Sequence, residues 1–233
     1  MTKRTVVCTL ALIVMVWLGG TLLTAQEAKP AAAQPQAKAG EKTGLPAAAR
    51  EGRMSLDEAL ARRRSVREYT DKTLSERELG QLLWAAQGVN RPDGHRTAPS
   101  AMARYPLELY VATPSGFFHY EPREHQIERR GGDLRPAISK AARGQKQIML
   151  SPAVFVFTAV FERMGAKPDD PRAARWIYVE AGHAAQNLLL EAVALGLAGV
   201  PMGGFDDKQL QENLPLPADH RPVYMVAVGQ PRQ

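Results

Sequence analysis

Residues 153–161 constrain the fold more than any other part of the sequence, because they are almost all Val, Phe, Ala and Thr. Such a continuous run of apolar, β-branched and aromatic side chains is typical of a strand buried on both faces. A strand of this kind lies inside a sheet that is covered on each side. The run therefore predicts a central sheet flanked by helices.

The longest predicted helix follows at about residues 173–197, where apolar side chains recur at helical spacing from Ile177 to Ala192. At about 1.5 Å per residue, a helix of this length spans more than roughly 30 Å. Gly196 and Gly199 are expected to end it. The helix is long enough to cross most of a domain.

Two earlier helices are predicted from capping-box signatures, Ser55 with Glu58 and Ser75 with Glu78. The first helix is expected to end near Arg63. The other expected elements are strands at 106–113, 117–120, 126–129, 199–202 and 223–228, and a helix capped by Asp206. Helices and strands mix without strict βαβ alternation, which indicates an α+β (α/β mixed) class with a central, mostly antiparallel sheet.

Residues 1–25 read as a targeting segment, with Lys3 and Arg4 before a nearly continuous apolar run at 6–18. A cleaved signal peptide and an uncleaved anchor are both open, because residues 5–24 reach the length of about 20 residues that spans a bilayer. Both alternatives place the rest of the chain outside the cytoplasm. It would be exported, periplasmic or extracellular, or anchored in the cytoplasmic membrane facing outward.

Residues 26–52 are rich in Ala, Pro, Gln, Lys and Gly, and we expect them to form a flexible linker to a folded domain at 53–233. The one cysteine, Cys8, lies in the targeting segment. Disulfides, a Cys nucleophile and a Cys-ligated metal are therefore excluded for the folded domain.

The net charge of +6 and the pI of about 9.6 do not by themselves indicate a nucleic-acid partner. The cationic residues are spread along the chain, and no RNP motif, zinc finger or heptad zipper accompanies them. We interpret the excess charge as a solubility feature.

The sequence contains no G-x-G-x-x-G after a strand, no Walker A motif, no H-E-x-x-H and no G-x-S-x-G. Its five histidines do not have metal-ligand spacing. We therefore predict no metal site and no catalytic side chain of the acid–base or nucleophilic kind. Any redox chemistry would belong to a cofactor.

Several segments could hold such a cofactor. The segment 62–67 groups four arginines with Ser65, and planar guanidinium groups match phosphate oxygens; a solvated basic helix end is the alternative. Small-residue loops at 96–102 and 199–205 could approach a planar ligand closely, and the C-terminal stretch 229–232 adds a cation. Each loop taken alone is also compatible with a purely structural role.

Together these motifs resemble a known family. R-R-S-V-R-x-Y, P-S-A before Y-P-L-E-L-Y-V, E-A-G-H-A-A-Q-N-L-L-L and G-V-P-x-G-G-F follow one another in the order found in the FMN-dependent nitroreductases. The nearest branch resembles the SagB/ThcOx-type dehydrogenases. The resemblance covers almost all of 53–233. It implies a nitroreductase-like fold and a domain-spanning homodimer with FMN at its interface.

The resemblance also assigns cofactor contacts. The implied FMN-binding residues are Arg63, Arg64, Ser65, Arg67 and Arg232 for the phosphate and ribityl chain, Pro99, Ser100, Ala101 and Met102 along the isoalloxazine, and Pro201, Met202, Gly203 and Gly204 at its N5 and O4 edge. Two positions depart from the family pattern. This chain has Gly203 and Ala103 where many nitroreductases carry Glu and Asn.

The implied activity is hydride transfer through flavin N5, with NAD(P)H as donor and a nitro- or quinone-like small molecule as acceptor. A second hypothesis is a flavin dehydrogenase or oxidase of a peptide or small molecule, as in azoline-oxidising relatives. A third is a flavin-binding module without catalysis, tethered to the membrane through residues 5–24.

Overall fold

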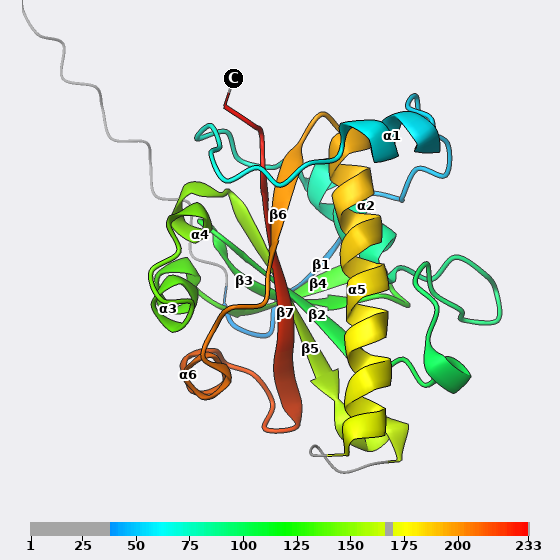
Figure 1. Ribbon diagram of the computed structural model, residues 1–233, viewed down its shortest axis with the longest axis vertical. Coiled ribbons are helices and arrows are strands. Elements are labelled where there is room, and N and C mark those ends of the chain that lie inside the picture. Colours follow the sequence, from blue (N-terminus) through cyan, green and yellow to red (C-terminus); the bar gives the residue numbers. More distant parts are fainter. Residues whose placement is uncertain (1–37, 166–169, 233) are drawn as a thin grey trace, which may run out of the picture. The chain divides into compact units, whose positions relative to one another are not determined.

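The computed structural model describes residues 38–165 and 170–232, and an antiparallel seven-stranded sheet runs through them in the order β1-β4-β3-β2-β5-β7-β6 (Figure 1). The strands are β1 (Lys42–Gly44), β2 (Leu107–Thr113), β3 (Gly116–Glu121), β4 (Gln126–Gly131), β5 (Ala153–Val160), β6 (Ala198–Met202) and β7 (His220–Gly229). The predicted α+β class with a central antiparallel sheet is confirmed.

Helices cover both faces of this sheet. They are α1 (Leu56–Arg62), α2 (Glu76–Gln87), α3 (Arg135–Ala141), α4 (Lys146–Leu150), α5 (Pro171–Ala194) and α6 (Asp207–Asn213), with 3-10 turns η1 (Ala101–Ala103) and η2 (Phe161–Met164). The helices α1, α2 and α5 lie on one side of the sheet and α3, α4 and α6 on the other (Figure 1).

Strand β5 lies between β2 and β7, and all eight of its residues are buried. Because side chains alternate along a strand, Phe155 and Phe157 join the core beneath α5, whereas Val154 and Val156 join the core beneath α3 and α6. The prediction of a strand covered on both faces is therefore confirmed.

Helix α5 begins at Pro171, where the carboxylate of Asp170 accepts a hydrogen bond from the N–H of Arg172 at 2.8 Å. Its buried stripe runs from Ile177 to Ala192, at the predicted helical spacing. The chain leaves the helix through Gly196, whose φ of +74° favours glycine. The long helix was thus predicted with its correct buried face.

The two capping boxes differ in the structure. Ser75 and Glu78 form the full reciprocal box at the start of α2. Ser55 caps α1 by accepting from the N–H of Glu58, but the Glu58 carboxylate pairs with Arg62 at 2.6 Å instead of closing the box. Both helix starts were nevertheless predicted correctly.

Three elements were not predicted. Helices α3 and α4 are only 7 and 5 residues long, too short to show a helical period. Strand β1 pairs with β4 inside the stretch predicted as a linker, so that prediction is wrong for residues 42–44. Its three side chains are exposed, because backbone pairing rather than an apolar pattern holds this edge strand.

The predicted targeting segment, and the linker up to residue 37, lie outside the described residues. Within the part of the chain that the structure describes, no helix combines the length and the apolar character needed to cross a membrane.

Candidate functional site

The arginine-rich segment lies beside the edge strand β6. Helix α1 ends at Arg62, with Arg63 as its C-cap, and the chain then runs along β6, where Ser65 forms a single parallel bridge with Gly199. The N–H of Val66 donates to the carbonyl oxygen of Gly199 at 3.1 Å. The sheet edge thus holds the backbone of the segment and leaves the side chains of Arg64, Ser65 and Arg67 exposed.

The C-terminal strand brings Arg232 to the same place. The N–H of Arg232 donates to the carbonyl oxygen of Glu68 at 3.2 Å, and the N–H of Thr70 donates to that of Gln230 at 2.9 Å. Tyr69 between them is buried, and its hydroxyl donates to the Val66 carbonyl oxygen at 2.6 Å. Five of the predicted residues therefore gather in one place, although Arg232 lies 165 positions after Arg67 in the chain.

The side chains gathered there carry unneutralised positive charge. Among residues 38–165 and 170–232, none of the guanidinium groups of Arg63, Arg64, Arg67 and Arg232 forms an ion pair or a side-chain hydrogen bond. Four unpaired guanidinium groups and a free hydroxyl are a donor set that suits a phosphate group.

The glycine pair Gly203–Gly204 follows the far end of β6, and both residues are exposed. Neither amide N–H donates a hydrogen bond to a described residue, so both are available to a ligand. A Cβ atom on Gly203 would come no closer than 3.8 Å to Tyr224. Steric crowding by neighbouring residues therefore does not explain why this position is a glycine.

Gln145 holds this glycine loop, and it belongs to none of the motifs found in the sequence. Its side-chain amide donates to the carbonyl oxygen of Gly204 at 2.9 Å and lies on the connection between α3 and α4. A second link joins the same regions, since the N–H of Asp206 donates to the Ala141 carbonyl oxygen at 2.9 Å. A single glutamine between two helices that were not predicted belongs to no sequence motif, so the sequence could not have identified it.

The loop Pro99–Met102 contains the third predicted group, and its backbone is strained. Met102, Ala103 and Tyr105 have φ values of 55°, 52° and 46°, a region that side chains with a Cβ rarely adopt. Such strain persists where surrounding contacts hold it and is concentrated at functional sites. Asn187 of α5 contributes by donating to the carbonyl oxygen of Thr97 at 3.3 Å.

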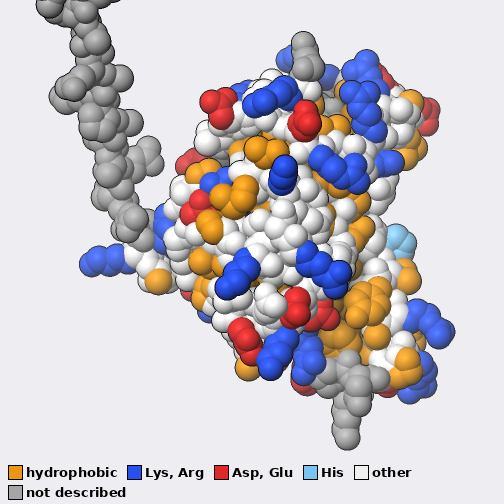
Figure 2. All heavy atoms as spheres, turned by 60° about the vertical axis from the view of Figure 1, so that its left-hand side comes forward, with side chains coloured by type: hydrophobic (Ala, Val, Ile, Leu, Met, Phe, Trp, Pro, Cys, Tyr) orange, Lys and Arg blue, Asp and Glu red, His pale blue; other side chains and the backbone are white. Residues whose placement is uncertain are grey.

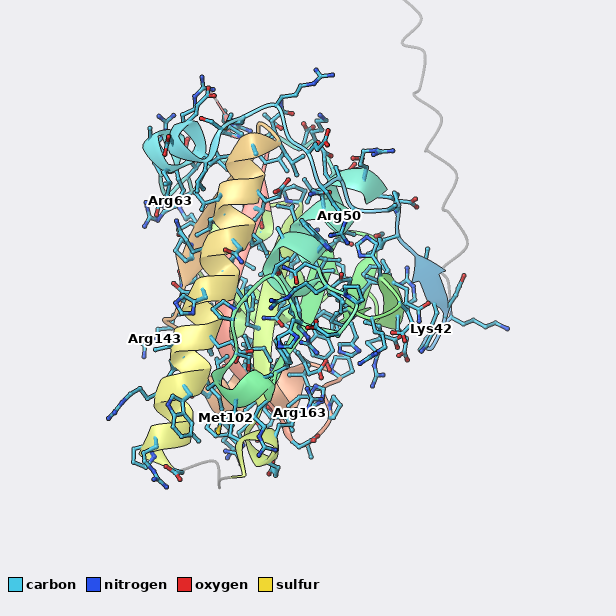
Figure 3. All side chains as sticks on the ribbon, turned by 90° about the vertical axis from the view of Figure 1, so that its right-hand side faces the viewer. Lys42, Arg50, Arg63, Met102, Arg143 and Arg163 are labelled. Atoms are coloured by element: carbon cyan, nitrogen blue, oxygen red, sulfur yellow. The ribbon has the colours of Figure 1, made fainter. Side chains whose placement is uncertain are left out.

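Within one chain this loop does not meet the other two groups. Arg63 lies near one end of α5 and Met102 toward the other (Figure 3). No hydrogen bond or β-bridge between described residues joins 99–102 to 63–67 or to 203–204. The structure therefore brings together the arginine segment, β6 and Arg232, but it leaves the Pro99–Met102 loop apart.

Large apolar side chains are exposed on the elements around these groups. They include Leu56 and Leu60 on α1, Met102 in η1, and Trp176, Tyr178 and Val179 on α5. Hydrophobic side chains also gather in a patch on the lower right of the face drawn in Figure 2, with basic side chains around them. Exposed apolar surface of this kind marks an interaction site more often than a free surface.

A polar cluster lies on the neighbouring strands β2, β3 and β4. Glu108 of β2 accepts from His119 Nε2 at 2.7 Å and pairs with Arg163 at 2.5 Å. Burial alone would raise the pKa of Glu108, but these two partners hold it at about 2. His119, Glu121 and Glu128 come within 4.8 Å of one another, but Lys42 and Arg130 already neutralise the two carboxylates.

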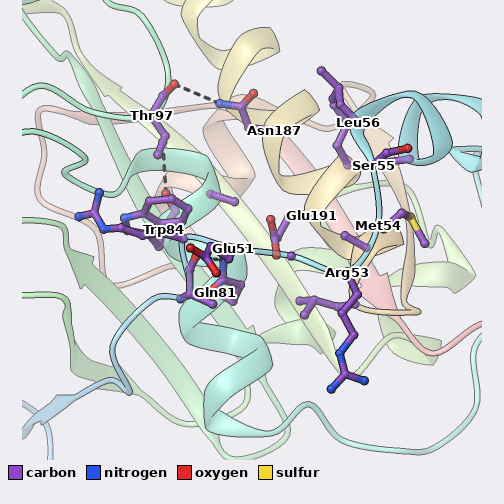
Figure 4. A pocket seen from close by; sticks show the side chains of 18 of the residues that line it. Glu51, Arg53, Met54, Ser55, Leu56, Gln81, Trp84, Thr97, Asn187 and Glu191 are labelled. Atoms are coloured by element: carbon purple, nitrogen blue, oxygen red, sulfur yellow. Dashed lines mark hydrogen bonds between the residues drawn. The ribbon is translucent and has the colours of Figure 1, made fainter.

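A pocket of about 580 Å³ lies between residues 49–56, α2 and the C-terminal half of α5 (Figure 4). Glu191, Trp84 and Asn187 line it, and none of the predicted cofactor residues does. Burial raises the pKa of Glu191 there. This pocket is separate from the arginine and glycine groups.

Comparison with known proteins agrees with the resemblance to the nitroreductases. The family model described as the nitroreductase family matches residues 60–230. A Methanocaldococcus jannaschii protein named as a nitroreductase is 37% identical over 184 residues, which cover 76% of this chain and 91% of the relative.

Solved structures give the same result. A crystal structure of a Ralstonia eutropha JMP134 protein named as a nitroreductase has a TM-score of 0.74 and 34% identity, covering 82% of this chain and 90% of its own. The NADPH:FMN oxidoreductase of Vibrio harveyi, in complex with NAD+, has a TM-score of 0.59 at 22% identity, over 76% of this chain and 69% of its own. This more distant structure shows a shared fold.

Proposed function

The chain belongs to the nitroreductase family, and on that premise we propose that it is an FMN-dependent oxidoreductase acting between NAD(P)H and a nitro- or quinone-like acceptor. One observation carries the proposal. The fold gathers Arg63, Arg64, Arg67 and Arg232 without anionic partners among the described residues, next to the strand that ends in the free amides of Gly203 and Gly204.

This donor set fits FMN. The guanidinium groups and the Ser65 hydroxyl suit a phosphate, which accepts several charge-assisted hydrogen bonds. The unpaired N–H groups of Gly203 and Gly204 suit the polar edge of a flavin ring, which presents acceptors to the protein. The V. harveyi enzyme, an NADPH:FMN oxidoreductase by name, has the same fold and supports this choice of cofactor.

Bound FMN would supply the redox chemistry, taking up a hydride and passing the electrons on. The net reaction moves one hydride from NAD(P)H and one proton from solvent to the acceptor. The chain's own groups bind and orient. The arginines hold the phosphate end, and the glycine amides stabilise negative charge at the ring, as preorganised backbone donors do elsewhere. The hydride transfer therefore requires no acid–base side chain from the protein.

We further infer that a second copy of the chain completes the site. The Pro99–Met102 loop lies apart from the arginine and glycine groups within one chain, while Tyr178 and Val179 on α5 are more than half exposed. A homodimer packed through α5 would cover these side chains. It would also let the loop of one copy face the arginines of the other.

A second candidate is oxidation of a peptide or small molecule, as in the SagB/ThcOx branch that the sequence resembles. The predicted targeting segment at 1–25 favours it, because NAD(P)H is scarce outside the cytoplasm. In this case the donor would be the organic substrate itself, which would lose a hydride and a proton.

Anaerobic mixing of the FMN-loaded full-length protein with NADH or NADPH tests the proposal. Loss of the oxidised flavin absorbance is expected, followed by its return when a quinone or nitroaromatic compound is added. The variant with both Arg63 and Arg67 changed to Ala serves as the control, because it should retain no flavin to reduce. Bound FMN that neither nicotinamide reduces would contradict the first candidate and leave the second.

A further inference from the structure

A cavity of about 460 Å³ lies between α6, the beginning of β7 and the first half of α5 (Figure 1). Phe161 and Tyr178 supply aromatic surface to it, and Pro222 and Val223 supply further apolar surface. Pockets for small organic ligands have volumes of roughly 300–1,000 Å³ and combine apolar surface with a few polar groups. The cavity therefore has the size and the lining for a planar ring.

The cavity borders the Gly203–Gly204 loop. Asp206, the N-cap of α6, follows Gly204 by two positions, and the next residue already lines the cavity. On the side of β7, a Cβ atom on Gly203 would lie 3.8 Å from the ring of Tyr224, the neighbour of the lining residue Val223. The loop proposed to hold the N5 and O4 edge of the flavin is thus continuous with two elements of the cavity.

A bulge in β7 shapes this end of the cavity. Pro222 pairs with Thr158 and Tyr224 pairs with Phe157, so Val223 is an extra residue in its strand. An extra residue of this kind bends the strand and turns neighbouring side chains, and such bulges are common next to active sites. Here it explains how three successive residues of one strand line the same cavity.

Two opposite charges line the cavity without pairing. Asp207 and Arg221 both belong to its lining, yet no ion pair joins them, and neither forms a side-chain hydrogen bond with a described residue. The other two charged residues of the lining, Lys208 and Glu212, pair with each other at 3.8 Å. A ligand group that bridges Asp207 and Arg221 must donate a hydrogen bond to the carboxylate and accept one from the guanidinium group. A primary carboxamide does both.

Resting on the proposed function, we propose that the cavity binds the carboxamide of the nicotinamide ring of NAD(P)H. The Asp207 carboxylate accepts from the amide N–H₂ group, and the Arg221 guanidinium group donates to the amide oxygen. The ring extends from the cavity toward the Gly203–Gly204 loop, where the flavin is proposed to lie. Because the nicotinamide ring is planar, fixing its carboxamide also orients the carbon that gives up the hydride.

Two analogues test the two contacts separately. In 3-acetylpyridine adenine dinucleotide a methyl group replaces the amide N–H₂, and in the thionicotinamide analogue a sulfur atom replaces the amide oxygen. Calorimetry with the oxidised dinucleotides and the FMN-loaded full-length protein measures binding without hydride transfer. The series used, NAD or NADP, is the one whose reduced form bleaches the flavin faster. The wild type should bind the natural dinucleotide about fivefold or more tightly than either analogue.

Each variant should lose one of these preferences and keep the other. Asp207→Ala should bind the natural dinucleotide and the acetyl analogue with a ratio of dissociation constants near one. Arg221→Ala should do the same for the thionicotinamide analogue. Both side chains are exposed and unpaired among the described residues, so their replacement should leave the fold intact. Because only ratios are compared, a general effect of the lost charge on all dinucleotides cancels.

Asp219→Ala is the matched control. Asp219 is an exposed acid in the turn before β7, and it does not line the cavity. This variant removes the same charge nearby and should keep both preferences. If Asp207→Ala and Arg221→Ala also keep both preferences, the inference is overturned.

Further outcomes separate this inference from the proposed function. If NADH or NADPH reduces the bound FMN but the variants bind like the wild type, only the inference fails. If neither dinucleotide binds or reduces the flavin, the proposed function fails with it. Reoxidation of the flavin by 4-nitrobenzamide and by methyl 4-nitrobenzoate covers the alternative that the cavity takes an amide of the acceptor. Slower reoxidation of Asp207→Ala by the amide alone, with unchanged dinucleotide preferences, would overturn the inference in favour of that alternative.

Discussion

The side-chain amide of Gln145 donates a hydrogen bond of 2.9 Å to the carbonyl oxygen of Gly204, across 59 positions of the chain. This bond joins the α3–α4 connection to the loop whose amides face outward.

Gln145→Ala should therefore loosen the glycine loop without unfolding the domain. Loss of one hydrogen bond of about 1 kcal/mol corresponds to an FMN dissociation constant raised about fivefold. Fluorescence titration with FMN measures this effect. Gln209→Ala on α6 is the control, since the Gln209 side chain is exposed and forms no hydrogen bond to a described residue. Equal affinity in both variants would exclude a role for Gln145.

Arg63→Ala combined with Arg67→Ala should release the cofactor and leave the dimer intact. Two charge-assisted hydrogen bonds to a phosphate are worth enough to raise the FMN dissociation constant by at least about 100-fold. Absorbance after gel filtration shows the loss, and the elution volume shows the oligomeric state. Arg91→Ala, in an exposed loop, should stay yellow. A fully yellow double variant would refute the phosphate assignment.

Val179→Glu should separate the subunits of the proposed homodimer, because a charge would be buried where α5 is expected to pack against the second copy. We expect a monomer by light scattering and, if the second copy completes the site as proposed, a loss of FMN. Leu150→Glu on α4 is the matched control. Leu150 is exposed to a similar extent, 49% against 54% for Val179, but lies on the other side of the sheet. Dimers of unchanged affinity in Val179→Glu would rule out packing through α5.

Acid should destabilise the domain through Glu108. Its pKa is about 2 in the folded protein, below its ordinary value of 4.5, so the stabilisation is present above about pH 4.5 and is lost as the pH falls toward 2. The loss amounts to about 3 kcal/mol in the free energy of unfolding. Urea unfolding at pH 5 and pH 2.5 measures it.

Glu108→Gln should show a smaller decrease between these pH values, while Glu124→Gln, an exposed residue, should behave as the wild type. If the three proteins lose equal stability, the His119 and Arg163 contacts do not hold the Glu108 carboxylate.

Features that depend on residues close together in the sequence could be predicted from it. Ser55 and Ser75 cap their helices, β5 is buried on both faces, and α5 has the expected apolar stripe, since each follows from a local pattern with a period of its own. The family motifs were likewise contiguous. They indicated which short segments to expect at a cofactor site.

The arrangement of those segments was decided only by the tertiary structure. Arg232 reaches Glu68 because β7 inserts between β5 and β6, and Gln145 reaches Gly204 because α3 and α4 pack beside β6. Hydrogen bonds between such distant residues depend on sheet order, which no local period encodes. For the same reason the Pro99–Met102 loop could be predicted from its motif only as one more segment lining the cofactor. The fold sets it apart from the arginines, next to α5, where Asn187 donates to the Thr97 carbonyl oxygen at 3.3 Å.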